Sequence, residues 1–301
     1  MAINLGIIRK GTYSLLVRGQ AFLAIINADE KKSFYRTGSI SPHIVLNPMR
    51  LTIPQCILLL FSFIEGDGDV LKLFYKNLLP ISESISDRDA GGYLPEIYRA
   101  IIKEHRSKAR SGDDLLRIQK ILDTADKIEK RKYIKKAAKD ILLHSVTPRL
   151  EPFVDLGLLS KPDPFNYRYQ ITDATRAFFE QLISSESIDH FLNQSFFQAA
   201  NKAFAINAEH RADRETILPL IQKAYTVLKS PLGYAPILEV SLLAGIYSIT
   251  EMGTYFELSE SLDSLKSLQK EKPDLVRFNV DRWGALSFVK FINEKSEVKG
   301  L

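Results

Sequence analysis

The stretch from Ile141 to Ile183 constrains the fold more than any other part of this 301-residue chain. Its first half repeats apolar residues at steps of three and four, at Val146, Leu150, Phe153, Leu156 and Leu159. This spacing predicts a helix that opens at Ser145 or Thr147, has Pro148 in its first turn and turns one face towards a core.

The second half of the stretch predicts a short hairpin and another helix. Gly157 allows a close turn, and residues 161–164 (Lys-Pro-Asp-Pro) break the helical pattern. Residues 167–172 then alternate like a strand, and Thr172 or Asp173 caps an apolar helix that reaches Leu182.

The order helix, Leu-Gly-Leu-Leu, hairpin, threonine, helix resembles the recognition helix and wing of winged helix-turn-helix proteins. The resemblance covers about a seventh of the chain. It implies a mainly α fold with short β-hairpin wings, and a function that is most often DNA binding.

The N-terminus repeats part of this pattern. Residues 5–10 (LGIIRK) align with residues 156–161, and residues 13–22 align with residues 169–178, with six identities in total. Only four residues precede the repeat, so the helices that should carry this wing are missing. We therefore expect either that the chain is a fragment of a longer protein or that a protein partner completes the repeat.

Composition narrows the class of protein. With 45% hydrophobic and 26% charged residues, the chain is typical of a folded soluble protein. One cysteine, Cys56, excludes a disulfide framework, and the histidines lack metal-ligand spacing, so we expect no metal and no cofactor. No signal peptide or membrane span is evident, which predicts a cytoplasmic location; an oligomer is compatible.

Positive charge is concentrated before and at the predicted recognition helix. Residues 99–139 carry 14 lysines and arginines against 6 acidic residues, whereas the whole chain is only +5. Such a patch is typical of proteins that neutralise phosphates, although a solvated helix face gives the same pattern. The candidate phosphate ligands here are Lys130, Arg131, Lys132, Lys135, Lys136 and Lys139.

The predicted recognition helix itself carries mixed charge. With its apolar stripe inward, the residues left outside are Thr147, Arg149, Glu151, Pro152 and Asp155. Two of them are acidic, which favours phosphate binding by the flanks over base readout. Thr147, Arg149 and the wing residues Tyr167 and Arg168 are the candidate DNA contacts in this region.

The C-terminal third predicts a second winged helix. Leu258, Leu262, Leu265 and Leu268 line one face of a helix, and Ser261, Ser264, Lys266 and Lys270 are expected on the other. Two alternating runs, 276–280 and 286–291, predict a hairpin. Lys266 and, at the hairpin tip, Arg282 and Trp283 are candidate DNA contacts. Residues 82–92, by contrast, are expected to form a polar loop.

These patterns predict three parts. Residues 1–38 are a partial winged-helix repeat, residues 49–188 a central winged-helix domain with the basic segment, and residues 189–301 a C-terminal helical and winged-helix domain. We found no catalytic motif; Asp274 with Glu297 and Lys299 resembles a metal-dependent nuclease pattern only superficially.

The leading hypothesis is double-stranded DNA binding by a non-catalytic recognition or regulatory protein. Such a protein could also be the recognition part of a restriction or defence assembly whose catalytic part lies on another chain. The alternative is a protein-interaction scaffold that uses winged helices as docking modules, and a metal-dependent nuclease is the weakest hypothesis.

Overall fold

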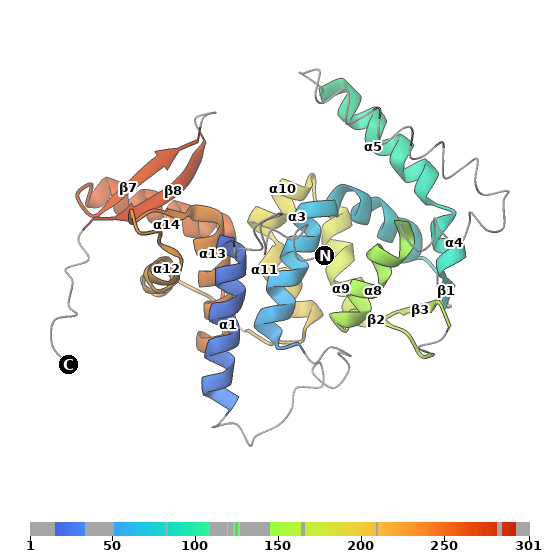
Figure 1. Ribbon diagram of the computed structural model, residues 1–301, viewed down its shortest axis with the longest axis horizontal. Helices are drawn as coiled ribbons and strands as arrows, with labels where there is room; N and C mark the ends of the chain where they lie inside the picture. The colour runs from blue at the N-terminus through green and yellow to red at the C-terminus, as the bar shows by residue number, and fades with distance from the viewer. Residues whose placement is uncertain are drawn as a thin grey trace. The chain divides into compact units, whose positions relative to one another are not determined.

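The computed structural model describes residues 16–33, 51–81, 84–108, 145–163, 166–208, 210–281 and 285–292, with single residues at 119, 123 and 126. Within this part the chain is mainly helical with small sheets, which confirms the predicted class. It forms two compact units (Figure 1). The central unit contains residues 67–188, and the C-terminal unit combines residues 189–301 with residues 52–66 and the N-terminal helix.

The central unit begins inside helix α3 (Ile53–Leu78), which is interrupted at Asp67 by a non-helical backbone (φ −141°, ψ 19°). The second part of α3 is followed by β1 (Ile85–Ser86), α4 (Asp87–Gly91) and α5 (Leu94–Lys108). After residues outside the described part come α8 (Thr147–Asp155), β2 (Leu159–Ser160), β3 (Arg168–Ile171) and α9 (Asp173–Ser184).

The predicted helix, hairpin and second helix around residues 147–184 are confirmed, but the first helix is shorter than predicted: it ends at Asp155, so Leu156 follows it and Leu159 lies in β2. Pro148 lies in the first turn of α8. Thr172 caps α9 reciprocally with Thr175, and the Thr172 hydroxyl also donates to the carbonyl of Leu158 at 2.5 Å. This cap fixes where the hairpin ends and the helix begins, because it ties the start of α9 to β2.

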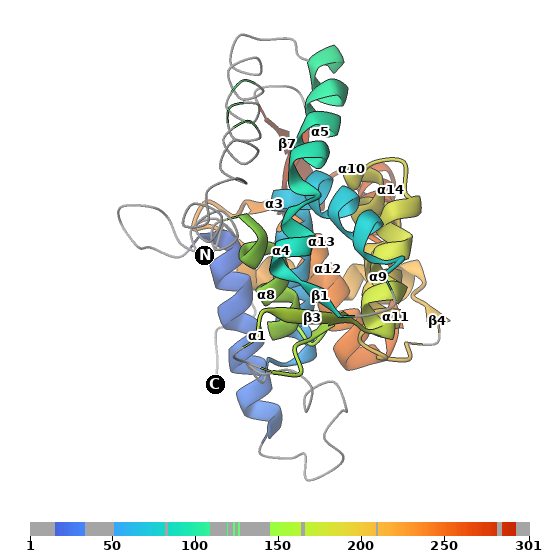
Figure 2. The same cartoon turned by 90° about the vertical axis from the view of Figure 1, so that its right-hand side faces the viewer.

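The predicted polar loop at residues 82–92 is wrong. Ile85 and Ser86 form β1, which pairs antiparallel with β3, and Ser86 accepts a hydrogen bond from the N–H of Asp89 to start α4. The sheet order is therefore β1-β3-β2 (Figure 2). A two-residue strand is too short to show alternation, which is why the sequence pattern did not reveal it.

The core of the central unit is a cluster of aromatic rings. Tyr75 and Phe179 stack with centroids 3.6 Å apart, and Phe153 meets both edge-on at 5.3 to 5.4 Å. All three side chains are buried. The cluster joins α3, α8 and α9, so the position of the predicted recognition helix depends on it.

The C-terminal unit contains α10 (Ile188–Gln194), α11 (Phe196–Ala203), β4 (His210–Arg211), α12 (Arg214–Leu228), β5 (Ala235–Pro236), α13 (Ile237–Tyr247), the π-helix η2 (Ser248–Met252) and β6 (Thr254–Tyr255). It ends with α14 (Leu258–Glu271), β7 (Val276–Val280) and β8 (Leu286–Phe291). The predicted hairpin is confirmed, and β5 pairs with β8 to give the order β5-β8-β7.

Helix α14 is placed as predicted, but its two faces differ from the expectation. Ser261 and Ser264 are buried rather than outside, because the Ser261 hydroxyl lies 2.8 Å from that of Ser241 on α13. Small hydroxyl side chains let the two helices approach closely while their polar atoms find partners. Lys266 and Lys270 are exposed, as expected.

Helix α1 (Val17–Ser33) belongs to the C-terminal unit and lies beside α12 and α13 (Figure 2). It begins at Val17, the residue that the internal alignment pairs with Asp173, where α9 begins. The rest of the N-terminal repeat, residues 5–15, lies outside the described residues.

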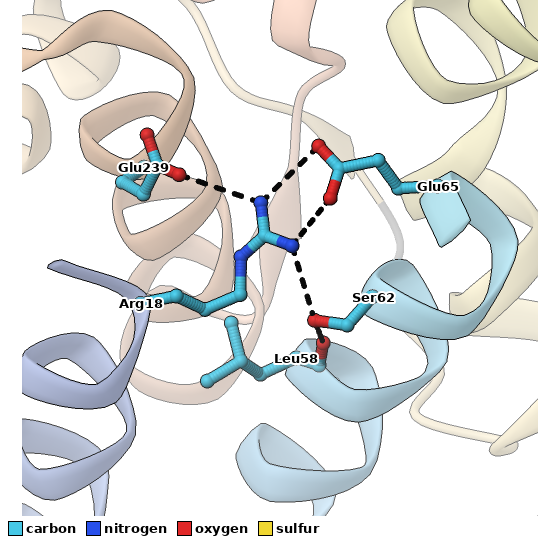
Figure 3. Close-up of polar contacts among 5 residues, drawn as sticks. All are labelled: Arg18, Leu58, Ser62, Glu65 and Glu239. Carbon is cyan, nitrogen blue, oxygen red and sulfur yellow. Dashed lines mark hydrogen bonds and ion pairs between the residues drawn. The ribbon is translucent and has the colours of Figure 1, made fainter. Parts of the chain in front are cut away.

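One buried cation attaches α1 to its neighbours (Figure 3). The Arg18 guanidinium donates to both carboxylate oxygens of Glu65 on α3, and it lies 3.4 Å from Glu239 on α13. It also approaches the hydroxyl of Ser62 at 3.5 Å, and its residue is only 7% exposed. Three helices distant in sequence therefore share one charge-assisted contact.

Candidate nucleic-acid interface

Arg149, a candidate DNA contact on α8, is already paired inside its own unit. Its Nε lies 2.7 Å from Oδ2 of Asp67, and a terminal nitrogen donates to Oδ1 of Asp67 at 3.1 Å. Another donates to the carbonyl of Ser145 at 2.5 Å, and the guanidinium lies over the ring of Tyr98. A phosphate would have to displace these partners, so in this conformation Arg149 serves to hold α8 against α3 and α5.

The neighbouring Glu151 is neutralised from the hairpin. Its carboxylate lies 2.7 Å from Nζ of Lys161 and accepts the phenol hydrogen of Tyr169 at 2.6 Å. Burial and the adjacent carboxylate raise the pKa of Tyr169, which keeps this phenol protonated as a donor. These contacts hold the hairpin against α8.

The outward face of α8 therefore carries two carboxylates, of which Glu151 is paired with Lys161, and the cation of the helix, Arg149, is paired with Asp67. Pro148 is exposed, and Glu151 and Asp155 are partly exposed. Burial, with Glu151 adding to it, raises the pKa of Asp155. Pro152, which we expected outside, is buried. Such a face is poorly suited to enter the major groove of a polyanion.

The central hairpin, β2–β3, is better suited than α8 to contact a polyanion. Tyr167 is 50% exposed, with Nζ of Lys161 4.9 Å from its ring centre. Arg168 is exposed and donates to the Ser84 hydroxyl at 3.3 Å. Both can reach a nucleic-acid backbone, and Thr147 lies partly exposed at the start of α8.

Of the candidate DNA contacts outside this hairpin and α8, the structure describes Lys266 but not the basic segment or the tip of the C-terminal hairpin. Lys266 on α14 is exposed and has only a distant contact, 3.9 Å, with Asp263 one turn away. The basic residues Lys130, Arg131, Lys132, Lys135, Lys136 and Lys139, and the hairpin-tip residues Arg282 and Trp283, all lie outside the described residues.

The sequence analysis missed an exposed surface on the C-terminal sheet. Arg277 and Asn279 on β7 and Phe288 on β8 are exposed, and Lys290 on β8 is partly exposed. They alternate with Val276, Phe278, Val289 and Phe291, three of which are buried. We call Arg277, Asn279, Phe288 and Lys290 the sheet patch. The sequence contains a signal for this surface: the residues at the positions between the inward apolar residues of the hairpin, when they are taken together.

A buried carboxylate positions α14. The Glu257 side chain, which is inaccessible to solvent, accepts the backbone N–H groups of Phe197 and Gln198 at the start of α11, at 3.0 and 2.9 Å. Glu257 also precedes α14, where it forms a reciprocal cap with Glu260. Burial, which outweighs the two N–H donors, raises the pKa of Glu257 to about 7.

This raised pKa predicts how the stability of the C-terminal unit depends on pH. Because the folded state holds the proton between pH 4.5 and about 7 while the unfolded state releases it, the contribution of Glu257 to stability falls as the pH rises through that window. We expect Glu257→Gln to destabilise the unit most near pH 5, and the difference from the parent protein to shrink by about 2–3 kcal/mol by pH 8. Urea unfolding of both proteins at pH 5, 6, 7 and 8 measures this, and a constant difference would contradict it.

No group of three or more histidine, cysteine, aspartate or glutamate side chains is arranged to hold a metal ion among the residues described. In the same part of the chain, no helix combines the length and the apolar composition needed to cross a membrane. Compared with known proteins, the chain matches no protein-family model, no curated protein and no solved structure.

Proposed function

We propose that this chain binds double-stranded DNA through two winged-helix units. The observation that carries the proposal is that both units contain, in the same order, a helix, a short strand, further helical segments, a helix and a hairpin, with α5 added in the central unit and η2 and β6 added in the C-terminal unit. In each of them the short first strand pairs with the last strand of the hairpin, giving the orders β1-β3-β2 and β5-β8-β7.

This order and pairing support the proposal because they resemble a winged helix-turn-helix domain, in which the helix before the hairpin and the hairpin itself face the nucleic acid. In the central unit these elements are α8 and β2–β3, and in the C-terminal unit they are α14 and β7–β8. The fold supports DNA binding but does not identify a function by itself, so the proposal also depends on charge.

The charges favour phosphate binding over base readout. The outward face of α8 carries two carboxylates, whereas Arg168, Lys266 and Lys270 are exposed cations on the hairpin or helix of the two units. The surplus of positive charge in residues 99–139 adds to this footprint. In this proposal the role is recognition or regulation, alone or within a restriction or defence assembly.

A second candidate function is docking of a protein partner on α8. The acidic, internally hydrogen-bonded face that Glu151 and Asp155 form favours it, because this face repels DNA. A protein partner that completes the N-terminal repeat would also be consistent with this docking function.

Charge reversal separates the two functions. We expect the triple variant with Lys135, Lys136 and Lys139 each changed to Glu to lower duplex affinity at least about 100-fold, since it removes three phosphate contacts and adds repulsion. The matched control reverses Lys76, Lys202 and Lys229 in the same way, because these lysines are exposed and lie outside the basic segment, α14 and the hairpins. Equal loss in both variants, or none in either, would contradict the assignment of the basic segment.

A further inference from the structure

The sheet patch combines two cations, an amide and an aromatic ring on one open face. The register places Phe288 opposite Asn279 and Lys290 opposite Arg277. These cross-strand neighbours are in contact range of one another. The third strand adds Pro236 beside Phe288, so the ring lies in the middle strand of the β5-β8-β7 sheet.

Phe288 is exposed although it lies within a paired strand. Its exposed fraction is 40%, whereas Val289 is fully buried and Phe291 is 9% exposed. The inward residues are sufficient to attach the hairpin to the unit; for example, Phe291 contacts the ring of Tyr225 at 4.9 Å. The outward ring is therefore not required for core packing and leaves one apolar surface open to a ligand.

The charge on this face is one-sided. Strands β5, β7 and β8 contain no aspartate or glutamate. The carboxylate of Asp281, the residue that follows β7, accepts the N–H of Ala285 at 3.0 Å across the end of the hairpin. A polyanion would therefore meet Arg277 and Lys290 without a carboxylate between them.

The loop before β5 holds Lys290 along the edge of the patch. Its ammonium donates to the carbonyl of Leu232 at 3.1 Å and lies 5.0 Å from the ring centre of Tyr234. Gly233 has a positive φ of 79°, and a Cβ there would lie 3.2 Å from Cε of Lys290. Glycine at this position gives the lysine room beside the loop.

We propose that the sheet patch binds single-stranded nucleic acid. One base stacks on Phe288, the Asn279 amide hydrogen-bonds to a base edge, and Arg277 and Lys290 contact the flanking phosphates. An aromatic ring on the surface of a sheet can stack on the face of a base only where that base is unstacked from its neighbours, which holds in a single strand and not in an intact duplex.

This inference goes beyond the proposed duplex binding. The two proposals share the β7–β8 hairpin, but the sheet patch acts through base stacking on Phe288, whereas duplex binding depends on phosphate contacts of the basic segment, α14 and the hairpins. Base-dependent binding of a single strand and salt-dependent binding of a duplex can therefore fail separately.

The test is fluorescence anisotropy of the full-length protein with a labelled oligothymidine and with an abasic oligonucleotide of equal length. We expect the parent protein to bind oligothymidine about 5- to 100-fold more tightly, since base stacking on an aromatic ring contributes about 1–3 kcal/mol. Phe288→Ala should remove that preference, and Phe288→Tyr should keep it.

Val227→Ala is the matched control, because Val227 is 41% exposed on α12, outside the patch. It should leave both affinities unchanged. Arg277→Gln should lower the dependence of log affinity on log salt by about 0.7, the value for one phosphate contact on a single strand. Thermal unfolding of each variant checks that the fold is retained.

Equal affinity for the two oligonucleotides would overturn the inference without requiring any variant to fold. It would also be overturned if Phe288→Ala lowered the oligomeric mass in light scattering, because the patch would then bind a second copy of the chain. The triple variant of Lys135, Lys136 and Lys139 keeps the two proposals apart, because it should lose duplex affinity but retain the preference for oligothymidine over the abasic oligonucleotide.

Discussion

Arg18→Met is expected to lower the free energy of unfolding of the C-terminal unit by about 3 kcal/mol. Arg18 is buried and is the shared partner of Glu65 and Glu239, so its removal leaves two carboxylates without their cation. Glu65 keeps 36% of its side chain exposed, which moderates the loss. Helix α1 should lose most of its order, because this contact fixes it to α3 and α13.

The single cysteine makes this prediction measurable within one unit. Cys56 is fully buried on the part of α3 that belongs to the C-terminal unit. Its rate of labelling by a thiol reagent at increasing urea reports when that region opens. We expect the labelling midpoint of Arg18→Met to shift to lower urea.

Arg214→Met is the matched control for Arg18→Met. Arg214 also forms a two-point ion pair, with Glu271 at 2.5 and 2.9 Å, but this pair is exposed. Exposed pairs contribute little to stability, so we expect Arg214→Met to lower the free energy of unfolding much less than Arg18→Met does. Similar losses in the two variants would show that burial does not determine the importance of Arg18.

Phe179→Ala is expected to destabilise the central unit by about 3–5 kcal/mol. The ring is fully buried, stacks on Tyr75 and contacts the edge of Phe153, so its removal leaves a cavity where α3, α8 and α9 meet. Because α8 is held through this cluster, the helix and the hairpin should lose protection together.

Hydrogen exchange followed by mass spectrometry measures this loss by segment. In Phe179→Ala we expect faster exchange in peptides covering residues 147–155 and 168–184, with little change in residues 237–247 of the other unit. Phe179→Leu, which keeps most of the apolar volume, should cost about 1–2 kcal/mol. An equal effect of the two variants would contradict a cavity as the cause.

The sequence predicted the elements whose pattern is local. The helices at residues 147–155 and 258–271 and the two hairpins follow from apolar spacing, the cap at Thr172 and alternation, all of which lie within a few residues. These features are visible without any knowledge of distant partners.

The sequence did not predict contacts between distant segments. Strands β1 and β5 are two residues long and are defined only by their pairing with β3 and β8. The membership of α1 in the C-terminal unit depends on Arg18 meeting a residue 221 positions away. Local periodicity contains no information about either contact.

The same difference between local features and distant contacts applies to the candidate site. Tyr167, Arg168 and Lys266 are exposed, as a DNA contact requires, whereas Arg149 is paired with Asp67, 82 positions earlier in the chain. Whether a charged side chain is available to bind DNA depends on such partners. Helical periodicity shows only the side of the helix from which the residue projects. Conversely, the sheet patch is visible in the sequence once the outward positions of the hairpin are read together.

The most direct test of the central claim is duplex binding measured by fluorescence anisotropy at several salt concentrations. We predict that log affinity for a random-sequence duplex falls linearly with log salt, with a slope that corresponds to several phosphate contacts. No binding to the duplex even at low salt would contradict the account, and α8 would then be examined as a docking surface for a protein.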